Sequence, residues 1–250
     1  MKGSSNGYGT NDSACAGGWP AGFTLVELLV VIGVACVLVG LLMAMLAGAR
    51  RSANGVTCES NLRQWGAATL IYANEHNGQL PRRGQGVSPT VLVNRPTDWF
   101  NALPPMLKMK PYMDLAASGQ VPRPPGASIW LCPQAEDMQG TYYWSYAMNM
   151  ALSVWEANQN FGQPDKITGV GDTATMVFLA DGPGNYCSVF PSSQPDGYNP
   201  APRHRGCVNI CFLDGHVAAI PGSYIGCGTG LIERPDVRWH PPKSTWNSAQ

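Results

Sequence analysis

An unbroken apolar run occupies residues 23–48, and Glu27 is its only charged residue. Wound as an α-helix at ~1.5 Å per residue, this run would be about 39 Å long. That length exceeds the ~30 Å hydrocarbon core of a bilayer. The pattern therefore predicts a membrane-spanning helix over residues 23–49, with an acidic side chain close to its N-terminal end.

Helical periodicity continues beyond the apolar run, where it marks one face only. Spacings of three and four residues define this face, which consists of Cys58, Leu62, Trp65, Thr69, Tyr72 and His76. Asn77-Gly78 then supplies a C-terminal stop, and Pro81 prevents continuation. We expect one helix over about residues 24–77, whose second part, residues 50–77, is amphipathic and must pack on another element.

Residues 78–250 are expected to form a sheet and long loops. The clearest hairpin covers residues 207–220, in which Asp214-Gly215 is a two-residue turn that requires positive φ. Alternation along its first strand places Val208, Ile210 and Phe212 on one face and Cys207, Asn209, Cys211 and Leu213 on the other. The pattern predicts an α+β fold in which a long N-terminal helix packs on an antiparallel sheet.

The segment between the helix and the hairpin has weaker signals. Proline and glycine are frequent, which favours turns and irregular connections. A short helix is expected near residues 98–118, and strand-like runs lie at 129–132, 142–146 and 175–180, the last of which ends at Asp181-Gly182.

Composition excludes several partners for this 250-residue chain. Lys and Arg together number 16, as do Asp and Glu, so the net charge is zero and no basic field exists to attract nucleic acid. Only 13% of the residues are charged, and 29 glycines and 21 prolines imply many turns. Such a weakly charged, loop-rich surface suits a domain, residues 50–250, that lies outside the cytoplasm.

Glu27 needs a partner, because a lone carboxylate in a spanning helix is disfavoured by roughly 2.5–3.5 kcal/mol at the bilayer centre and by less near an end. Cleavage after Gly22 would make Phe23 the N-terminus and give it a cationic amine. Glu27 would then lie four residues into the helix, where the amine of a neighbouring parallel subunit can neutralise it. The open alternative is an interfacial glutamate that reaches the lipid headgroups.

The residues Gly22-Phe23-Thr24-Leu25-Val26-Glu27-Leu28-Leu29 resemble the N-terminal motif of type IV prepilins and type II secretion pseudopilins. In that family a membrane peptidase cuts after the glycine and methylates the new phenylalanine amine. The resemblance implies a cleaved leader over residues 1–22, with prepilin peptidase and other pilin-type subunits as partners. It also implies a single-pass protein of the cytoplasmic (inner) membrane, with its N-terminus inside and residues 50–250 in the periplasm or on a surface fibre.

A second resemblance lies at the hairpin. His204, nine intervening residues and Asp214-Gly215 match the C-terminal signature of a pseudopilin-like family that abounds in planctomycetes. The same family pattern is met elsewhere in the chain, at residues 58–81, 131–133, 145–149 and 179–182. The likeness thus extends from residue 22 to about residue 220, and the tail, residues 221–250, lies outside it.

Cysteines outside the leader and the membrane helix are Cys58, Cys132, Cys187, Cys207, Cys211 and Cys227. An even number is compatible with disulfides, but the sequence leaves their connectivity open. Cys207 and Cys211 would share one face of a strand. No cysteine pair has the two-residue spacing that is common in structural zinc sites.

His204 and Asp214 would face each other if residues 203–206 lead into the hairpin strand. Such a pair suits acid–base work or a metal site, whereas the simpler interpretation is a hydrogen bond that pins the entry loop and a turn role for Asp214. Asp181, Asp214 and nearby carbonyls offer the oxygen ligands that Ca²⁺ prefers. No serine lies in a nucleophile motif.

These observations predict a structural subunit of a type II secretion pseudopilus or a type IV pilus-like fibre, which acts by assembly and not as an enzyme and needs no cofactor. Two alternatives stay open. The first is a membrane-anchored surface domain that binds glycan or protein and does not polymerise. The second is a metal-dependent enzyme built on His204 and Asp214.

Overall fold

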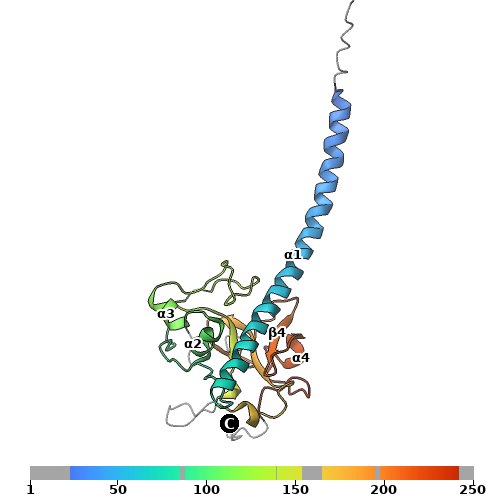
Figure 1. Ribbon diagram of the computed structural model, residues 1–250. Helices are drawn as coiled ribbons and strands as arrows, with labels where there is room; N and C mark the ends of the chain where they lie inside the picture. Colours follow the sequence, from blue (N-terminus) through green and yellow to red (C-terminus); the bar gives the residue numbers. More distant parts are fainter. Residues whose placement is uncertain (1–22, 85–87, 139, 154–164, 195–197, 242–250) are drawn as a thin grey trace, which may run out of the picture. The chain divides into compact units, whose positions relative to one another are not determined.

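The computed structural model of the protein describes residues 23–84, 88–138, 140–153, 165–194 and 198–241. The expected leader, including Gly22, lies outside these ranges. The chain divides into two compact units, Met1–Gly48 and Ala49–Gln250, and helix α1, Leu25–Glu75, contributes to both (Figure 1). The bounds of α1 agree with the helix expected over about residues 24–77.

In the first unit, α1 presents apolar side chains that no other described residue covers. Large hydrophobic residues from Phe23 to Leu46 are exposed. Among the helices that the structure describes, α1 alone is long and apolar enough to cross a membrane by length and composition. An exposed apolar surface of this size marks a site of contact with lipid or protein.

The second unit is built around a five-stranded sheet with the order β3-β1-β2-β4-β5. The strands are β1 (Trp144–Asn149), β2 (Val177–Gly184), β3 (Ser188–Val189), β4 (Cys207–Phe212) and β5 (Val217–Pro221). β2 therefore continues through Asp181-Gly182, where the sequence pattern predicted its end. Its length matters for the site, because Asp181 becomes a mid-strand residue with neighbours on both sides.

The sheet is mixed, and the expectation of a purely antiparallel sheet is wrong. β1, β2, β4 and β5 pair antiparallel in that spatial order, whereas β1 and β3 pair parallel. The chain reverses after β2, so β3 runs against β2 and in the same direction as β1. β3 has only two residues, too few for alternation to reveal it in the sequence.

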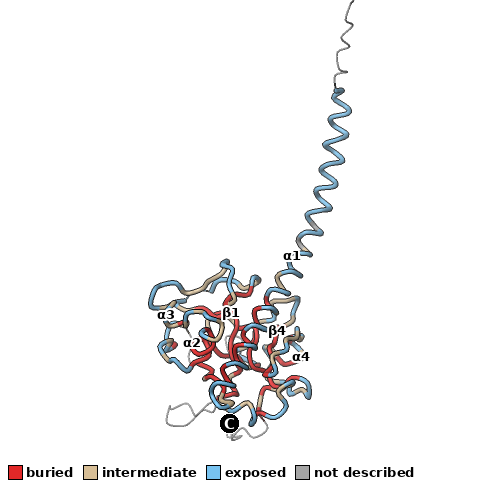
Figure 2. The backbone as a smooth tube through the Cα atoms, viewed as in Figure 1, coloured by how far each residue is buried: buried red, intermediate tan, exposed pale blue. Residues whose placement is uncertain are grey.

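Both faces of the sheet carry buried residues, and the backbone is coloured as buried through the middle of the second unit (Figure 2). The second half of α1 packs on one face through Cys58, Leu62, Trp65, Ala68 and Tyr72, together with Cys211 and Leu213 of the hairpin. The opposite face buries Val208, Ile210 and Phe212. This division confirms the alternation predicted for the first hairpin strand. His76 lies beyond the buried part of the helix face, and its exposed ring stacks on Tyr72 at a centroid distance of 3.9 Å.

Gly66 sets the closest approach between α1 and the hairpin. A Cβ atom at this position would lie 2.8 Å from Cys211 Sγ and 3.1 Å from Gly215 Cα. Real side-chain atoms do not come so close, so any larger residue at this position would force the helix or the hairpin to shift.

Short helical pieces occupy the segment where one short helix was expected: α2 (Trp99–Ala102), η1 (Pro104–Leu107) and α3 (Tyr112–Ala117). They enclose an aromatic cluster in which Trp65 packs edge-on against Trp99 at a centroid distance of 5.8 Å. Residues 129–132 form a turn and not the strand that their apolar character predicted, with Leu131 N donating to Ser128 O at 3.0 Å. Burial of Trp130 and Cys132 accounts for that character.

The remaining elements are η2 (Met150–Leu152), η3 (Ile167–Gly169) and α4 (Gly222–Ile225). The segment after α4 covers the second face of the sheet. Its Val237 and Trp239 are almost fully buried, and Val177 N donates to Arg238 O at 2.9 Å. The described part of the tail is therefore integral to the domain.

Candidate functional site

The spacing from His204 to Asp214-Gly215 is the length of one strand and its two turns. The first turn has Arg205 and Gly206 as its two central residues, whose φ values are 56° and 81°. It is closed by His204 N to Cys207 O and Cys207 N to His204 O, both 3.1 Å. Two consecutive positive φ angles are typical of a type I′ turn. β4 follows at once.

The second turn has three loop residues, Leu213–Gly215, and not the expected two. Gly215 N donates to Phe212 O at 2.9 Å, and Phe212 N donates to His216 O at 2.9 Å. Gly215 alone in this loop has positive φ, 91°. A three-residue loop with glycine at the left-handed position is a standard hairpin connection.

The structure does not bring His204 and Asp214 together. They lie at opposite ends of β4, a strand of six residues, which spans roughly 20 Å at ~3.3 Å per residue. Asp214 instead accepts hydrogen bonds from His216 N at 3.0 Å, with His216 Nδ1 at 2.6 Å. The turn interpretation of Asp214 is therefore right. The same separation removes the pair on which the metal-dependent enzyme alternative rested.

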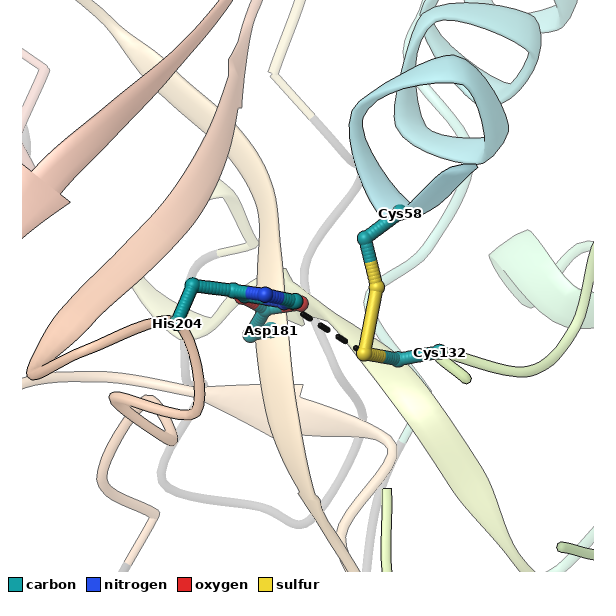
Figure 3. Close-up of side chains that lie close together, drawn as sticks. All are labelled: Cys58, Cys132, Asp181 and His204. Atoms are coloured by element: carbon teal, nitrogen blue, oxygen red, sulfur yellow. Dashed lines mark hydrogen bonds and ion pairs between the residues drawn. A yellow bond between two sulfur atoms is a disulfide. The ribbon is translucent and has the colours of Figure 1, made fainter. Parts of the chain in front are cut away.

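His204 lies beside Asp181 and Cys132 (Figure 3). Its Nε2 atom is 3.6 Å from Asp181 Oδ2 and 3.4 Å from Cys132 Sγ. The turn at residues 204–207 aims the imidazole at β2, on which Asp181 accepts a hydrogen bond from Asn209 N at 2.8 Å. Two neighbouring strands thus position the pair.

A disulfide joins Cys58 on α1 to Cys132, 74 residues later. Tyr146 on β1 donates its hydroxyl to Cys58 Sγ at 3.3 Å. The other candidate cysteines form no disulfide among the described residues: these are Cys187, Cys207, Cys211 and Cys227. One pairing is therefore selected from those that the sequence left open.

Burial dominates the electrostatics of this cluster. It raises the pKa of Asp181 to about 7, against the opposing influence of the Arg203 guanidinium and of the Asn209 N–H. Burial also lowers the pKa of His204, and the positive charge of Arg203 lowers it further. His204 is therefore held as a neutral imidazole at neutral pH. Arg203 donates to the carbonyl oxygens of Ser145 and Gly182, which keeps its charge close to both groups.

Four possible metal ligands meet here, one each from Cys58, Cys132, Asp181 and His204, with all ligand atoms within 4.8 Å of one another. We name them the Cys/Asp/His cluster. Sequence reasoning found His204 as a signature residue and both cysteines as disulfide candidates, but it did not join them to Asp181. The available signal was the shared resemblance expected from the sequence, which set Leu131-Cys132-Pro133 and Leu179-Ala180-Asp181-Gly182 beside His204.

The structure places the two carboxylates suggested as calcium ligands, Asp181 and Asp214, at different positions along the hairpin. Asp181 lies opposite Asn209 and is fully buried, whereas Asp214 follows the far end of β4. The strand from Asn209 to Phe212 alone spans roughly 10 Å at ~3.3 Å per residue, so the two carboxylates lie well apart.

At the N-terminal end of α1, Glu27 caps its own helix. Its Oε2 atom accepts from Thr24 N at 2.9 Å and from Thr24 Oγ1 at 2.7 Å, while Glu27 N donates to Thr24 Oγ1 at 3.2 Å. This reciprocal arrangement is a capping box, which satisfies amides that a helix start leaves free. Sequence reasoning missed it, although a threonine three residues before a glutamate is its pattern. Phe23 is exposed.

Comparison of the chain with protein-family models, with curated proteins and with solved structures finds no match.

Proposed function

We propose that the protein is a pilin- or pseudopilin-like structural subunit that is cleaved after Gly22 and assembles through the first half of α1. One observation carries the proposal: the apolar surface between Phe23 and Leu46 is exposed. A helix that is apolar all round is suited to lipid or to a bundle of similar helices. Both surroundings occur in turn for a subunit that leaves a membrane and enters a fibre.

The proposal assigns the chain an orientation and partners. The N-terminus faces the cytoplasm, the inner membrane holds the first half of α1, and residues 50–250 form the outer surface of the fibre. Prepilin peptidase removes residues 1–22 and methylates Phe23. Copies of this chain or other pilin-type subunits supply the neighbouring helices.

Glu27 has two tasks in this scheme. Before cleavage, its carboxylate accepts a hydrogen bond from Thr24 N, and its own N–H donates to Thr24 Oγ1, so the capping box satisfies both amides. After cleavage, the cationic amine of Phe23 on a neighbouring subunit offers a charge partner. An opposite charge in a medium of low dielectric stabilises the carboxylate more strongly than a neutral amide can.

Two substitutions separate these tasks. Glu27→Gln keeps an acceptor for the capping box but removes the charge, whereas Thr24→Ala removes the cap but keeps the charge. We expect Glu27→Gln to lose at least tenfold in subunit–subunit cross-linking and in fibre yield, while Thr24→Ala keeps both within about fivefold, because a cap is worth only about 1 kcal/mol.

The measurement is made on chains whose mature N-terminus is shown by mass spectrometry to be methylated Phe23, so that defects of cleavage do not enter the comparison. Assembly by Glu27→Gln at the wild-type level would refute the charge pairing. A native chain that retains Met1, or that never associates with other subunits, would instead support an anchored surface domain.

A further inference from the structure

We propose that the thiol form of this chain binds one Zn²⁺ ion through the four members of the Cys/Asp/His cluster, Cys58, Cys132, Asp181 and His204. The site excludes the Cys58–Cys132 disulfide and is formed only when both sulfurs are thiolates. It does not depend on the proposed role in a fibre, because all four residues belong to the second unit of the chain.

Two separations within the cluster, both made by His204, already fit a tetrahedral zinc site, and all four ligand atoms lie within 4.8 Å of one another. With Zn–S near 2.3 Å and Zn–N and Zn–O near 2.0–2.2 Å, the ligand atoms of such a site lie about 3.4–3.8 Å apart. His204 Nε2 is 3.4 Å from Cys132 Sγ and 3.6 Å from Asp181 Oδ2. These two contacts form two edges of the tetrahedron.

The two sulfur atoms must move apart before both can bind one zinc ion. In a disulfide they are about 2 Å apart, whereas two thiolates on one zinc ion are about 3.7 Å apart. Each sulfur therefore needs to move by less than about 1 Å when the bond is absent. Figure 3 shows His204 and Asp181 to one side of the bond between the two sulfurs, with His204 reaching toward Cys132.

Two buried polar atoms of the cluster have no hydrogen-bond partner among the described residues, Asp181 Oδ1 and His204 Nδ1. Burying a carboxylate beside a neutral imidazole costs free energy when neither group makes all of its hydrogen bonds. A cation at the cluster offsets this cost for Asp181 directly, and it fixes the ring of His204 through Nε2. The unpartnered Asp181 Oδ1 thus points to a cation independently of the distances.

The surroundings match those of a structural site. Asp181 and His204 side chains are 0% and 9% exposed, and both cysteines are buried, so four protein ligands close the site to water. Tyr146 donates to Cys58 Sγ and Asn209 N donates to Asp181 Oδ2, as outer partners of metal ligands commonly do. Two thiolates, one carboxylate, Zn²⁺ and the nearby Arg203 sum to zero charge.

Binding involves no electron transfer. The two thiols release their protons to solvent, their sulfurs bond to Zn²⁺, and His204 binds as the neutral imidazole. Newly made chains carry thiols, so this form needs no reductant. Conversion to the disulfide would remove two electrons and expel the metal, and it requires a disulfide-donating oxidant.

The test uses the full chain in detergent micelles, reduced with a phosphine, loaded with Zn²⁺ or Co²⁺ and then desalted. We expect about one metal ion per reduced chain and less than about a tenth of that for the oxidised chain. The Co²⁺ form is expected to show the intense visible bands of tetrahedral cobalt with thiolate charge transfer. His204→Gln is expected to weaken Zn²⁺ binding by more than about 100-fold in competition with a chelator.

His216→Gln is the matched control, because His216 also pairs with an aspartate, Asp214, at an exposed turn. It is expected to bind zinc as the wild type does. Equal metal retention by the two variants, or reduced wild type that desalts without metal, would overturn the proposal. Should His204→Gln fail to fold, the cobalt spectrum of the wild type decides, because octahedral cobalt without thiolate bands would be an equally clear refutation.

Discussion

At the residue scale, the domain contains a second buried carboxylate that is unrelated to the Cys/Asp/His cluster. Asp98 precedes α2 and makes no capping hydrogen bond with its side chain. It is 0% exposed, and neither carboxylate oxygen has a hydrogen-bond partner among the described residues. Burial raises the pKa of Asp98 to about 7, although the positive charges of Arg95 and Arg82 oppose this shift.

The raised pKa of Asp98 makes folding depend on pH. Between about pH 4 and pH 7 the unfolded chain has lost the proton of Asp98 while the folded chain keeps it, so the free energy of unfolding falls as the pH rises through this window. Above about pH 7 both states are ionised and the loss is complete. Asp98→Asn removes the contribution of Asp98 to this slope, whereas that of Asp181 remains. We therefore expect the variant to gain up to a few kcal/mol relative to wild type at pH 8 compared with pH 4, at about 1.4 kcal/mol per pKa unit.

Urea unfolding followed by tryptophan fluorescence, in detergent with a chelator present, measures this difference. Asp114→Asn is the control, because Asp114 is an exposed carboxylate in the first turn of α3. Its pH profile is expected to follow that of the wild type. A slope for Asp98→Asn as steep as that of the wild type would show that Asp98 is ionised in the folded protein.

At the scale of elements, two glycines on α1 are expected to respond in opposite ways to substitution by alanine. Gly66→Ala places a methyl group 2.8 Å from Cys211 Sγ and against the backbone of Gly215. We expect it to lower the free energy of unfolding by about 1–3 kcal/mol, because overpacking exceeds the gain in helix propensity. At Gly55 the nearest atom to the new methyl group is His204 Nδ1 at 3.8 Å, an ordinary contact.

Gly55→Ala should therefore raise stability by up to about 1 kcal/mol through helix propensity and chain entropy. The two variants are compared by thermal melting under the same conditions, each against wild type. If both substitutions stabilise the domain, the tight packing of α1 on the hairpin is wrong, since propensity alone would then account for both.

Elements with strong local patterns were predictable from the sequence. The helix from Leu25 to Glu75 and the face that it buries follow from spacing, and the two faces of β4 follow from alternation. β3 and the extension of β2 were not predictable, because their hydrogen bonds come from strands distant in the sequence. The strand predicted for residues 129–132 was wrong, because their apolar side chains are buried although their backbone forms a turn.

The Cys/Asp/His cluster shows the same limit. His204 was recognisable in the sequence, and the sequence suggested Asp214, which belongs to the same signature, as its partner. Pairing of β2 with β4 instead brings Asp181 opposite Asn209, close to the turn that carries His204. His204 and Asp214 are only ten residues apart in the sequence, but β4 lies between them and separates their side chains. His204 and Asp181 are 23 residues apart, yet the pairing of β2 with β4 brings them together.

At the scale of the whole molecule, the two units of the chain differ in what they require. The second unit buries its apolar residues on both faces of the sheet, and the disulfide ties α1 to a segment 74 residues away. The first unit exposes its apolar residues instead. We therefore expect the boundary at Gly48 and Ala49 to separate a water-soluble domain from a segment that needs lipid, detergent or neighbouring helices.

A chain that begins at Ala49 tests this expectation. It keeps nine residues of helix before Cys58, about two and a half turns, so the buried face of α1 from Cys58 to Tyr72 is preceded by enough helix to resist fraying. We expect it to remain monomeric in water without detergent, to form the Cys58–Cys132 disulfide and to melt within a few degrees of the full chain in micelles. Circular dichroism and analytical ultracentrifugation make the measurement. Aggregation of this fragment, or a melting temperature far below that of the full chain, would mean that residues 23–48 support the fold of the domain and do not serve only as its apolar anchor.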